Sequence, residues 1–406
     1  MQTPVERVTP ASVDELAAFV ARCDREGVAI AIEGGNTLHG MGLSARAGIA
    51  LSTLGLNRIV EDAPADLTVA VQSGVRLQTL AATLARHGTF VPFDAPLAVD
   101  ATVGGTLAAG WLGPRRHLYG RPRDYILGTV AVLADGTIAR AGGMVVKNVA
   151  GYDMSRLYTG SFGTLCVLAQ ANMKTLPLPT HARFFLAKLP EGTRTRAIAY
   201  CSSMPIAPSA VFWIEGFSRA IDGDDGPEGR LLVLLEGSDA LVERATRELR
   251  SAIGRAGVPE TRIADAGARE SLARVIDAYV TSITERSITY RIAAAPDDAE
   301  SRALGLRALA ERFELRNDII VDAMNGDIVF RISDLDAHAL AGKIEMFDDA
   351  LHDEEPRASV IAGDHPARTL LQVWGAPPEG LDRMRELKTR FDPNGTLNAG
   401  RFVGGI

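Results

Sequence analysis

The chain has 406 residues, 47% of them hydrophobic and 23% charged, with a net charge of −7; this length allows two or three domains, and the composition is that of an ordinary globular protein. The acidic balance provides no basic surface, which excludes nucleic acid as an expected partner. Three widely spaced cysteines form no CxxC pair, which excludes an internal cysteine-bound iron–sulfur cluster and argues against a disulfide scaffold.

The first predicted elements are a helix and a buried strand. Residues 12–15 (Ser-Val-Asp-Glu) form a capping box, apolar residues follow at helical spacing, and Gly27 ends the helix. The strand 28–32 leads directly into the glycine-rich run 33–42. A second strand, 67–71, precedes a second helix. The glycine-rich run is therefore expected to begin where a strand ends.

Small residues and a hairpin follow. Residues 101–113 are nearly all glycine or other small residues, and 129–140 is a predicted hairpin with Asp135-Gly136 as its turn. A strand is expected over 164–175. The prolines of 176–179 (Leu-Pro-Leu-Pro) indicate a domain boundary.

Beyond residue 180, strand-like runs alternate with amphipathic helices. The predicted elements are a strand at 231–236 with a helix to 250, a strand at 288–294 with a helix at 299–313, strands at 319–322 and 327–332 around the turn Asn325-Gly326, and helices at 337–351 and 381–390. This order predicts repeated split βαβ units, an antiparallel sheet with helices on one face.

Three glycine-rich segments are candidates for holding a dinucleotide. They are 34–38, 101–110 and 160–165, and no GxGxxG or P-loop pattern accompanies them. Successive backbone N–H groups in the first segment can form an anion site, and small side chains in the second let the backbone approach a ring or phosphate. Each segment taken singly is also explained as a glycine-rich turn or a close contact between sheet and helix.

Together these segments resemble the PCMH-type (vanillyl-alcohol-oxidase) FAD-binding superfamily. The matching runs are 33–37 (Glu-Gly-Gly-Asn-Thr), 101–106 (Ala-Thr-Val-Gly-Gly-Thr) and 151–165. The tail from Phe391-Asp-Pro to Asn-Ala-Gly-Arg401 resembles the branch that holds D-lactate and glycolate dehydrogenases. Within it, the run 145–153 and the short chain are similar to the E-subunit family of bacterial glycolate oxidases.

The resemblance implies an α+β fold in three stretches. Residues 1–180 would form a PCMH-type FAD-binding domain, and 181–380 a ferredoxin-like antiparallel-sheet cap domain that covers the isoalloxazine and takes the substrate. Residues 381–406 would return to the FAD domain.

The resemblance also assigns residues to a noncovalent FAD, because Asn36 stands where covalent members carry a histidine. The assigned residues are Gly34, Gly35, Asn36, Thr37 and Leu38 at the pyrophosphate, Thr102, Gly104, Gly105 and Thr106 along the ribityl chain and pyrophosphate, Gly160, Ser161, Gly163 and Leu165 near the adenine and ring edge, and Pro92 and Asp94 in the same channel.

Candidates for the catalytic end are four cations. Lys147, Arg291, Arg331 and Arg401 are of the type that clamps a carboxylate or stabilises a reduced flavin. The alternatives are a solvated loop lysine and structural ion pairs, and no catalytic base stands out. Catalytic members of the branch carry histidines in the cap, whereas the matching stretch 322–329 has none, so no metal site is expected.

The resemblance implies an FAD-dependent oxidoreductase acting on CH–OH groups. The expected role is that of a glycolate oxidase subunit that oxidises 2-hydroxy acids, glycolate to glyoxylate, and passes electrons to a larger flavin subunit and an iron–sulfur subunit. The alternatives are a stand-alone oxidoreductase for another small hydroxy acid or alcohol, and a structural subunit. Without a signal pattern or membrane span, the expected location is the cytoplasm, with peripheral attachment at the inner membrane through partners left open.

Overall fold

The computed structural model describes residues 6–145, 151–190, 192–217, 229–259, 262–281, 287–333, 341–363 and 370–406. The chain divides into two compact units. The first comprises Met1–Gly113, Arg121–Leu178 and Pro377–Ile406, and the second comprises Pro114–Gly120 and Pro179–Ala376. The chain therefore passes from one unit to the other four times.

The first unit contains a three-stranded parallel sheet. Its order is β1-β3-β2, with β1 at Glu6–Val8, β2 at Ile30–Glu33 and β3 at Ile49–Ser52. Helix α1 (Val13–Glu26) precedes β2, with Ser12 accepting from the Glu15 N–H at its N-cap and Gly27 in the left-handed conformation at its C-cap. The Ser12 cap and the terminating glycine are as predicted, because both depend only on neighbouring residues. The Glu15 carboxylate accepts from the Ala11 N–H, one residue before the Ser12 N–H that a capping box would use.

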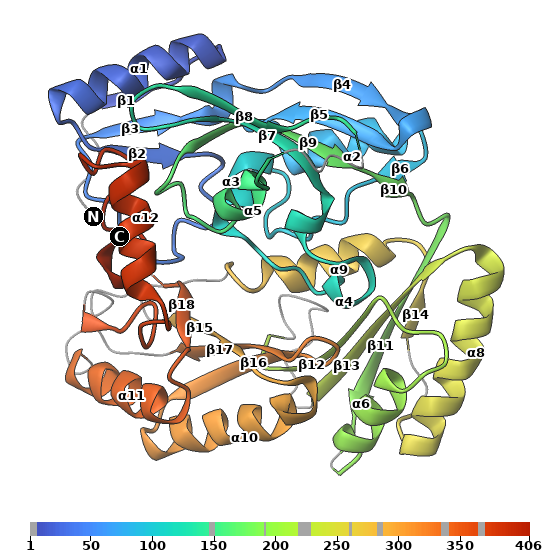
Figure 1. The fold of residues 1–406 in the computed structure, drawn as a ribbon. Helices are drawn as coiled ribbons and strands as arrows, with labels where there is room; N and C mark the ends of the chain where they lie inside the picture. Colours follow the sequence, from blue (N-terminus) through green and yellow to red (C-terminus); the bar gives the residue numbers. More distant parts are fainter. Residues whose placement is uncertain are drawn as a thin grey trace. The chain divides into compact units, whose positions relative to one another are not determined.

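A five-stranded antiparallel sheet completes this unit (Figure 1). Its strands, in spatial order, are β4 (Ile59–Ala63), β5 (Thr68–Gln72), β9 (Val167–Lys174), β7 (Ile126–Val132) and β8 (Ile138–Gly142). Val167 and Ala169 pack in one core with α1, whereas Cys166 and Leu168, on the alternate face of the strand, line a cavity. The sheet thus separates a packed core from the candidate site.

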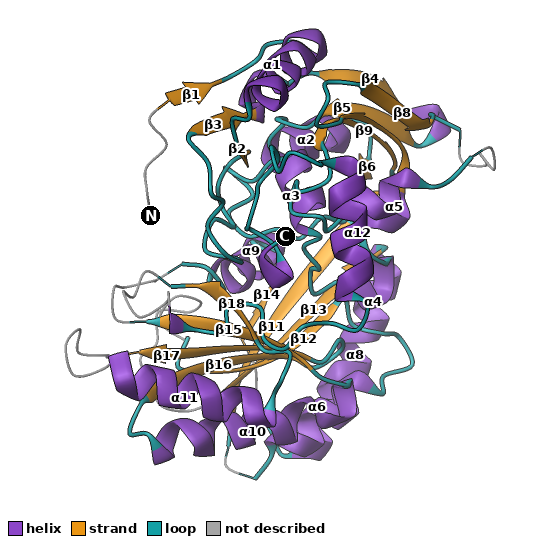
Figure 2. Ribbon diagram, turned by 60° about the vertical axis from the view of Figure 1, so that its left-hand side comes forward, coloured by secondary structure: helices purple, strands orange, loops and turns teal. Residues whose placement is uncertain are grey.

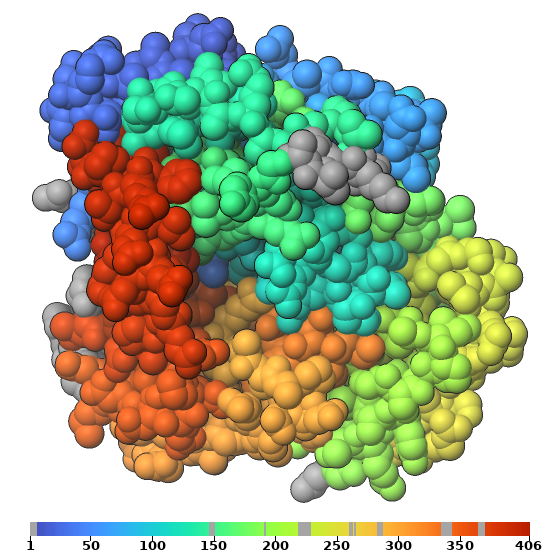
Figure 3. All heavy atoms as spheres, viewed as in Figure 1, coloured from blue at the N-terminus to red at the C-terminus, as the bar shows by residue number. Residues whose placement is uncertain are grey.

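The remaining elements of the first unit are short. They are α2 (Leu77–Ala85), β6 (Thr89–Phe90), α3 (Val103–Ala109), α5 (Met154–Tyr158), β10 (Leu176–Pro177) and α12 (Leu381–Phe391). Helix α12 has no buried residue, and Figure 3 shows its red atoms on the face viewed. Beyond α12, Leu397 forms a parallel bridge to Ile30 of β2. The C-terminal tail is thereby part of the first unit.

The second unit contains an eight-stranded antiparallel sheet (Figure 2). Its spatial order is β14-β11-β13-β12-β16-β17-β15-β18. The strands are β11 (His181–Leu189), β12 (Ala210–Glu215), β13 (Gly229–Gly237), β14 (Arg262–Ala264), β15 (Ile288–Ala293), β16 (Arg316–Asp322), β17 (Asp327–Ser333) and β18 (Ser359–Ala362). The sheet consists of two halves, β14-β11-β13-β12 and β16-β17-β15-β18, and each has the strand order of a ferredoxin-like βαββαβ unit. The halves are joined where β12 pairs with β16.

Helices cover this sheet mainly on one face. Helices α6 (Arg194–Ser202), α8 (Asp239–Ala256), α10 (Pro296–Arg312) and α11 (Ala341–Glu354) contribute to one core with alternate strand residues. Helix α9 (Ala268–Asp277) packs on β11 and lies with the short helix α4 (Arg116–Tyr119) on the opposite side (Figure 1). The predicted α+β fold with a repeated split βαβ cap is confirmed.

Some predicted boundaries differ from those observed. The strand predicted at 28–32 is β2 at Ile30–Glu33. The helix predicted at 337–351 coincides with α11, which is described from Ala341 to Glu354, and residues 337–340 lie outside the described residues. The segment Pro114–Gly120 groups with the second unit. Within the described ranges, none of the helices combines the length and the apolar character needed to span a membrane.

Candidate functional site

The first unit contains a cavity lined by the predicted glycine segments. Its wall is formed by the end of β2 and the loop after it, by α3, by the start of β9 and by the C-terminal tail. The lining residues are Ile32, Glu33, Gly34, Gly35, Asn36, Thr37, Leu38, His39, Thr53, Ser73, Thr102, Gly104, Gly105, Thr106, Ala108, Ala109, Phe162, Gly163, Cys166, Leu168, Asn398 and Arg401.

The loop after β2 presents a row of backbone donors to this cavity. In the part of the chain that the structure describes, the N–H groups of residues 34–38 find no hydrogen-bond acceptor. Asn36 has a positive φ of 56°, a conformation that turns successive N–H groups toward one point. Unsatisfied donors in this arrangement suit an anion such as a phosphate, which needs no lysine here.

The second segment places a short helix against the same loop. Thr102 is the N-cap of α3, and its side chain accepts from the Gly105 N–H. A Cβ at Gly35 would overlap the Asp100 carbonyl, and one at Gly104 would lie 2.5 Å from Ser73 Cβ. Glycine is required at both positions because the backbone of neighbouring segments approaches so closely.

Ser73 adds an unsatisfied side chain to the wall. It is 2% exposed, and its Oγ has no hydrogen-bond partner among the described residues. A buried hydroxyl without a partner costs free energy unless a ligand satisfies it. Together with the free N–H groups of residues 34–38, this orphaned oxygen fits a polar ligand with phosphate and hydroxyl groups, as FAD is.

The third segment is hydrogen-bonded to the second. The Gly160 N–H donates to the Leu107 carbonyl (2.9 Å) and the Phe162 N–H to the Ala108 carbonyl (2.8 Å). A Cβ at Gly110 would lie 2.8 Å from Gly160 Cα. The two segments, which are about fifty residues apart in the sequence, therefore form one continuous wall.

Most residues assigned to the cofactor from the sequence lie together in this cavity. Those that line it are Gly34, Gly35, Asn36, Thr37, Leu38, Thr102, Gly104, Gly105, Thr106 and Gly163, together with Arg401 from the catalytic candidates. Gly160, Ser161 and Leu165 line a neighbouring apolar cavity beside Met384 and Phe402. Pro92 and Asp94 line neither cavity.

Asp94 instead has a structural position. Its backbone carbonyl accepts from the Trp111 indole N–H at 2.9 Å, and its side chain packs where a Cβ of Gly113 would lie. Trp111 is 1% exposed, so the bond satisfies a buried donor. The sequence suggested Asp94 only because it precedes the second segment.

The two candidate arginines of the second unit, Arg291 and Arg331, form their hydrogen bonds within that unit. Arg291 donates to Asp327 at 2.5 Å. Arg331, which is 4% exposed, donates to Thr289 and to two backbone carbonyls, and its guanidinium lies 4.4 Å from the ring centroid of Phe217. Lys147, the fourth candidate, lies outside the described residues.

Asp327 belongs to a buried charge cluster at the β16–β17 turn. Arg116 of α4 donates to Asp327 at 2.8 Å and lies 3.9 Å from Asp322. Burial, and then the neighbouring Asp327, raise the pKa of Asp322 to about 7. Among the residues that the structure describes, no group of three or more His, Cys, Asp or Glu side chains is placed to hold a metal ion.

Sequence reasoning missed Ser73, Phe162 and Asn398 as wall residues. Ser73 follows β5 immediately before Gly74, where a strand end meets a glycine, and that position was the available signal. Asn398 belongs to the tail motif that carried the resemblance, but its contacts depend on residues far away in the chain.

Comparisons with known proteins agree with this geometry. A family model described as an FAD binding domain matches residues 4–155. The Bacillus subtilis glycolate oxidase subunit GlcD is 26% identical over 97% of this chain and 88% of its own length. The Escherichia coli glycolate oxidase subunit GlcE is 36% identical over 47% of this chain and 51% of that protein. The Archaeoglobus fulgidus D-lactate dehydrogenase is 27% identical over 98% of this chain and 90% of its own length.

Solved structures share the fold at low sequence identity. An alkyldihydroxyacetonephosphate synthase superposes with a TM-score of 0.72 at 15% identity, covering 97% of this chain and 75% of its own. A p-cresol methylhydroxylase superposes with a TM-score of 0.70 at 16% identity, and the match covers 97% of this chain and 88% of that chain. The chain therefore has a PCMH-type fold, its cofactor is FAD, and it is an FAD-dependent oxidoreductase.

Proposed function

We propose that the chain holds FAD in the cavity of its first unit and oxidises a small 2-hydroxy acid, glycolate first, as a subunit of a glycolate oxidase-type complex. The second unit is the cap that takes the substrate. The observation that carries the cofactor site is the row of unsatisfied N–H groups at residues 34–38, which faces the same cavity as Ser73 and α3.

The substrate class is supported by the relatives. Two of them are glycolate oxidase subunits and one is a D-lactate dehydrogenase, and both names refer to small 2-hydroxy acids. FAD supplies a two-electron acceptor for such a substrate. Arg401 contributes positive charge to the cavity wall, where it can favour the diphosphate or the substrate carboxylate.

The proposed complex rests on the same relatives and on the cysteines. Two relatives are named as subunits, and Cys23, Cys166 and Cys201 are separate, buried and free. Electrons leaving the flavin then pass to partners, a larger flavin subunit and an iron–sulfur subunit. Peripheral attachment at the inner membrane would come through those partners.

The cofactor site is tested by filling the cavity. A Cβ at Gly105 would meet only Thr102 Oγ1, at 3.0 Å, so valine there projects into the cavity without striking backbone. Gly105→Val is expected to abolish stoichiometric FAD while circular dichroism stays unchanged. Gly48→Val is the matched control, because a Cβ at Gly48 has no atom within 4 Å. Full FAD content in Gly105→Val would show that the cofactor lies elsewhere.

The reaction is tested by anaerobic reduction of the bound flavin. Glycolate and D-lactate are mixed with the purified chain alone and with its partner subunits, and flavin absorbance is followed. Bleaching only with partners supports the proposed subunit. Bleaching with the chain alone would replace the proposal with a stand-alone dehydrogenase, which the match to D-lactate dehydrogenase over 98% of this chain makes the second candidate. Bleaching in neither case would overturn hydroxy-acid oxidation.

A further inference from the structure

The wall of the cavity is a closed ring of chain segments. The first segment approaches the second at Gly35 and Asp100, and the third is hydrogen-bonded to the second through the Leu107 and Ala108 carbonyls. The third segment approaches the strand that carries the first at Gly163 and Ile32, and among the described residues the C-terminal tail adds hydrogen bonds to both. The tail therefore helps to determine how far apart the first and third segments lie.

The tail joins β2 by main-chain bonds and then by one side chain. The Ile30 N–H donates to the Thr396 carbonyl (2.8 Å), and the Asn398 N–H donates to the Ile30 carbonyl (3.0 Å). The next strand donor, the Ile32 N–H, is satisfied by Asn398 Oδ1 at 2.7 Å. The side-chain oxygen thus continues the pairing where the tail main chain turns away, with Asn398 at a φ of 45°.

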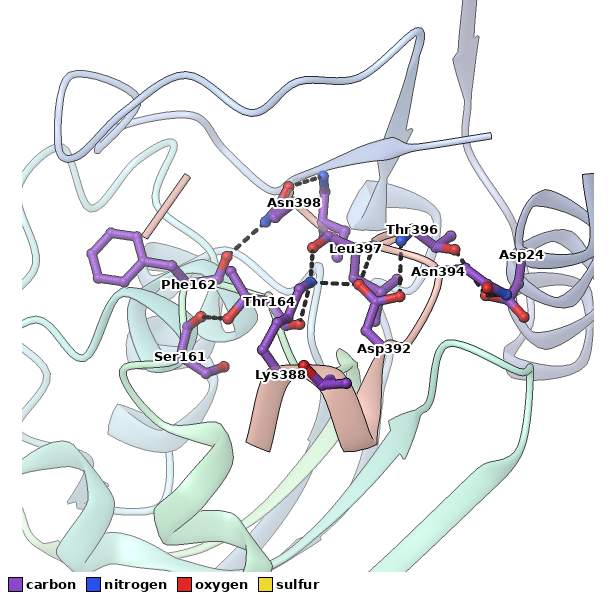
Figure 4. A network of polar contacts seen from close by, with 12 residues as sticks. Asp24, Ser161, Phe162, Thr164, Lys388, Asp392, Asn394, Thr396, Leu397 and Asn398 are labelled. Atoms are coloured by element: carbon purple, nitrogen blue, oxygen red, sulfur yellow. Dashed lines mark hydrogen bonds and ion pairs between the residues drawn. The ribbon is translucent and has the colours of Figure 1, made fainter. Parts of the chain in front are cut away.

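The other end of the same amide reaches the third segment. Asn398 Nδ2 donates to the Phe162 carbonyl at 2.6 Å (Figure 4). Phe162 has a φ of 54°, and its ring stacks on Phe402 of the tail at 5.3 Å between centroids. Asn398 is 3% exposed, so neither bond is shared with bulk solvent. One planar amide therefore joins β2, the strand before the first segment, to the third segment.

A second buried group fixes the tail in this position. The Lys388 ammonium donates to the carbonyls of Thr164 (2.9 Å) and Leu397 (2.8 Å) and pairs with Asp392 (Figure 4). Asp392 in turn accepts from the N–H groups of Thr396 and Leu397, each at 2.8 Å. These bonds hold the residues before Asn398, so its amide is oriented before any ligand binds.

We propose that Asn398 is a positioning residue for FAD, which couples docking of the C-terminal tail to retention of the cofactor. The proposal rests on the FAD site proposed above. Because the amide spans the first and third segments, its loss lets the wall open and weakens cofactor binding. By reciprocity, bound FAD stabilises the docked tail by the same factor.

The test uses two substitutions that tolerate the positive φ. Asn398→Asp keeps the acceptor for the Ile32 N–H but removes the donor to Phe162, and Asn398→Gly removes both. FAD affinity of the full-length apoprotein is measured by quenching of flavin fluorescence, and apoprotein unfolding by thermal denaturation. The Kd is expected to rise roughly tenfold or more in both variants.

Asn394 supplies the matched control. It lies in the same tail, is exposed, and its amide donates to Asp24 of α1 outside the cavity. Asn394→Ala removes this exposed bond without placing a second carboxylate beside Asp24, and it is expected to leave the Kd unchanged. Hydrogen exchange of residues 396–401 is expected to slow on adding FAD to the wild type, and to slow less in Asn398→Gly.

Three outcomes separate the two proposals. A lower melting temperature with an unchanged Kd would make Asn398 merely structural and overturn this inference. A normal Kd in both Asn398 variants would overturn it equally, while loss of FAD in Gly105→Val would leave the cofactor site standing. Full FAD retention in Gly105→Val would instead remove the proposed site itself.

Discussion

Ser73 shows at the residue scale how a side chain is kept ready for a ligand. Its hydroxyl is buried and unpartnered among the described residues, although its backbone is fully used, with its N–H donating to Ala169 and its carbonyl accepting from Gly104. The backbone bonds fix the position, and Ser73 is one of the residues that line the cavity. An unsatisfied polar group in this place favours binding at the expense of stability.

Ser73→Ala separates these two effects. Removing the orphaned hydroxyl is expected to raise the free energy of unfolding of the apoprotein by about 1 kcal/mol and to weaken FAD binding roughly two- to tenfold. Urea denaturation without FAD and fluorescence titration with FAD measure the two quantities. Thr53 lines the same cavity but donates to the Glu33 carbonyl at 3.1 Å, so Thr53→Val should lower apoprotein stability instead. Loss of stability in Ser73→Ala would contradict this account.

At the scale of elements, the β16–β17 hairpin and α4 share a buried charge cluster. Asn325 donates to Asp322 at 2.8 Å within the turn, and Arg116 of α4 pairs with Asp327. Within the second unit, the α4 segment is thus bound to the carboxylates of one hairpin. Because these groups are buried, the protonation state of Asp322 affects the stability of the unit.

The expected pH dependence follows from the raised pKa of Asp322. The carboxyl loses its proton near pH 4 when unfolded and near pH 7 when folded, so the folded state holds more protons in that window. Raising the pH from 4 to 7 therefore destabilises the wild type relative to Asp322→Asn, by roughly 3 to 4 kcal/mol, and the difference then levels off. Urea unfolding at pH 5 and pH 8 measures it.

The exposed Asp353 of α11 gives the comparison for that experiment. Asp353→Asn should show no comparable change between the two pH values, because an exposed carboxylate is solvated in both states. A constant difference between wild type and Asp322→Asn at both pH values would show that this carboxyl is ionised in the folded state at pH 5.

Elements that depend on neighbouring residues were predictable from the sequence. Asp135-Gly136 and Asn325-Gly326 are turns with φ of 85° and 77° at the glycines, because only local chemistry is needed to form them. Asn398 was not predictable as a joint between segments, since its partners Ile32 and Phe162 are 366 and 236 residues away. The same holds for Pro114–Gly120, whose partner Glu236 lies 121 residues beyond Arg115.

At the scale of the whole molecule, each unit has a core of its own. Residues of α1, β2 and β9 form one in the first unit, and residues of the eight-stranded sheet and its helices form another in the second. The sequence predicted two such regions because glycine-rich segments give way near residue 180 to alternating strands and amphipathic helices. The domain limits 1–180, 181–380 and 381–406 stay a prediction. A ligand confined to one core should stabilise that unit selectively.

Hydrogen exchange measured by mass spectrometry tests this expectation. With FAD at about 100 times its Kd, the first unit should gain roughly 2.7 kcal/mol, seen as slower exchange in α1 and β9. Helices α8 and α10 of the second unit should exchange at the same rate with and without FAD. Equal slowing in both units would show that they unfold together.

The cavity wall combines residues that are far apart in the chain, and this sets an order of assembly during synthesis. Residues 32–39 and 102–109 of the wall are made long before Asn398 and Arg401, which line the same cavity. Strands and helices of a nascent chain can fold in turn, but the pocket lacks part of its wall until Arg401 has been added. A variant truncated before Thr396 is therefore expected to accumulate as apoprotein.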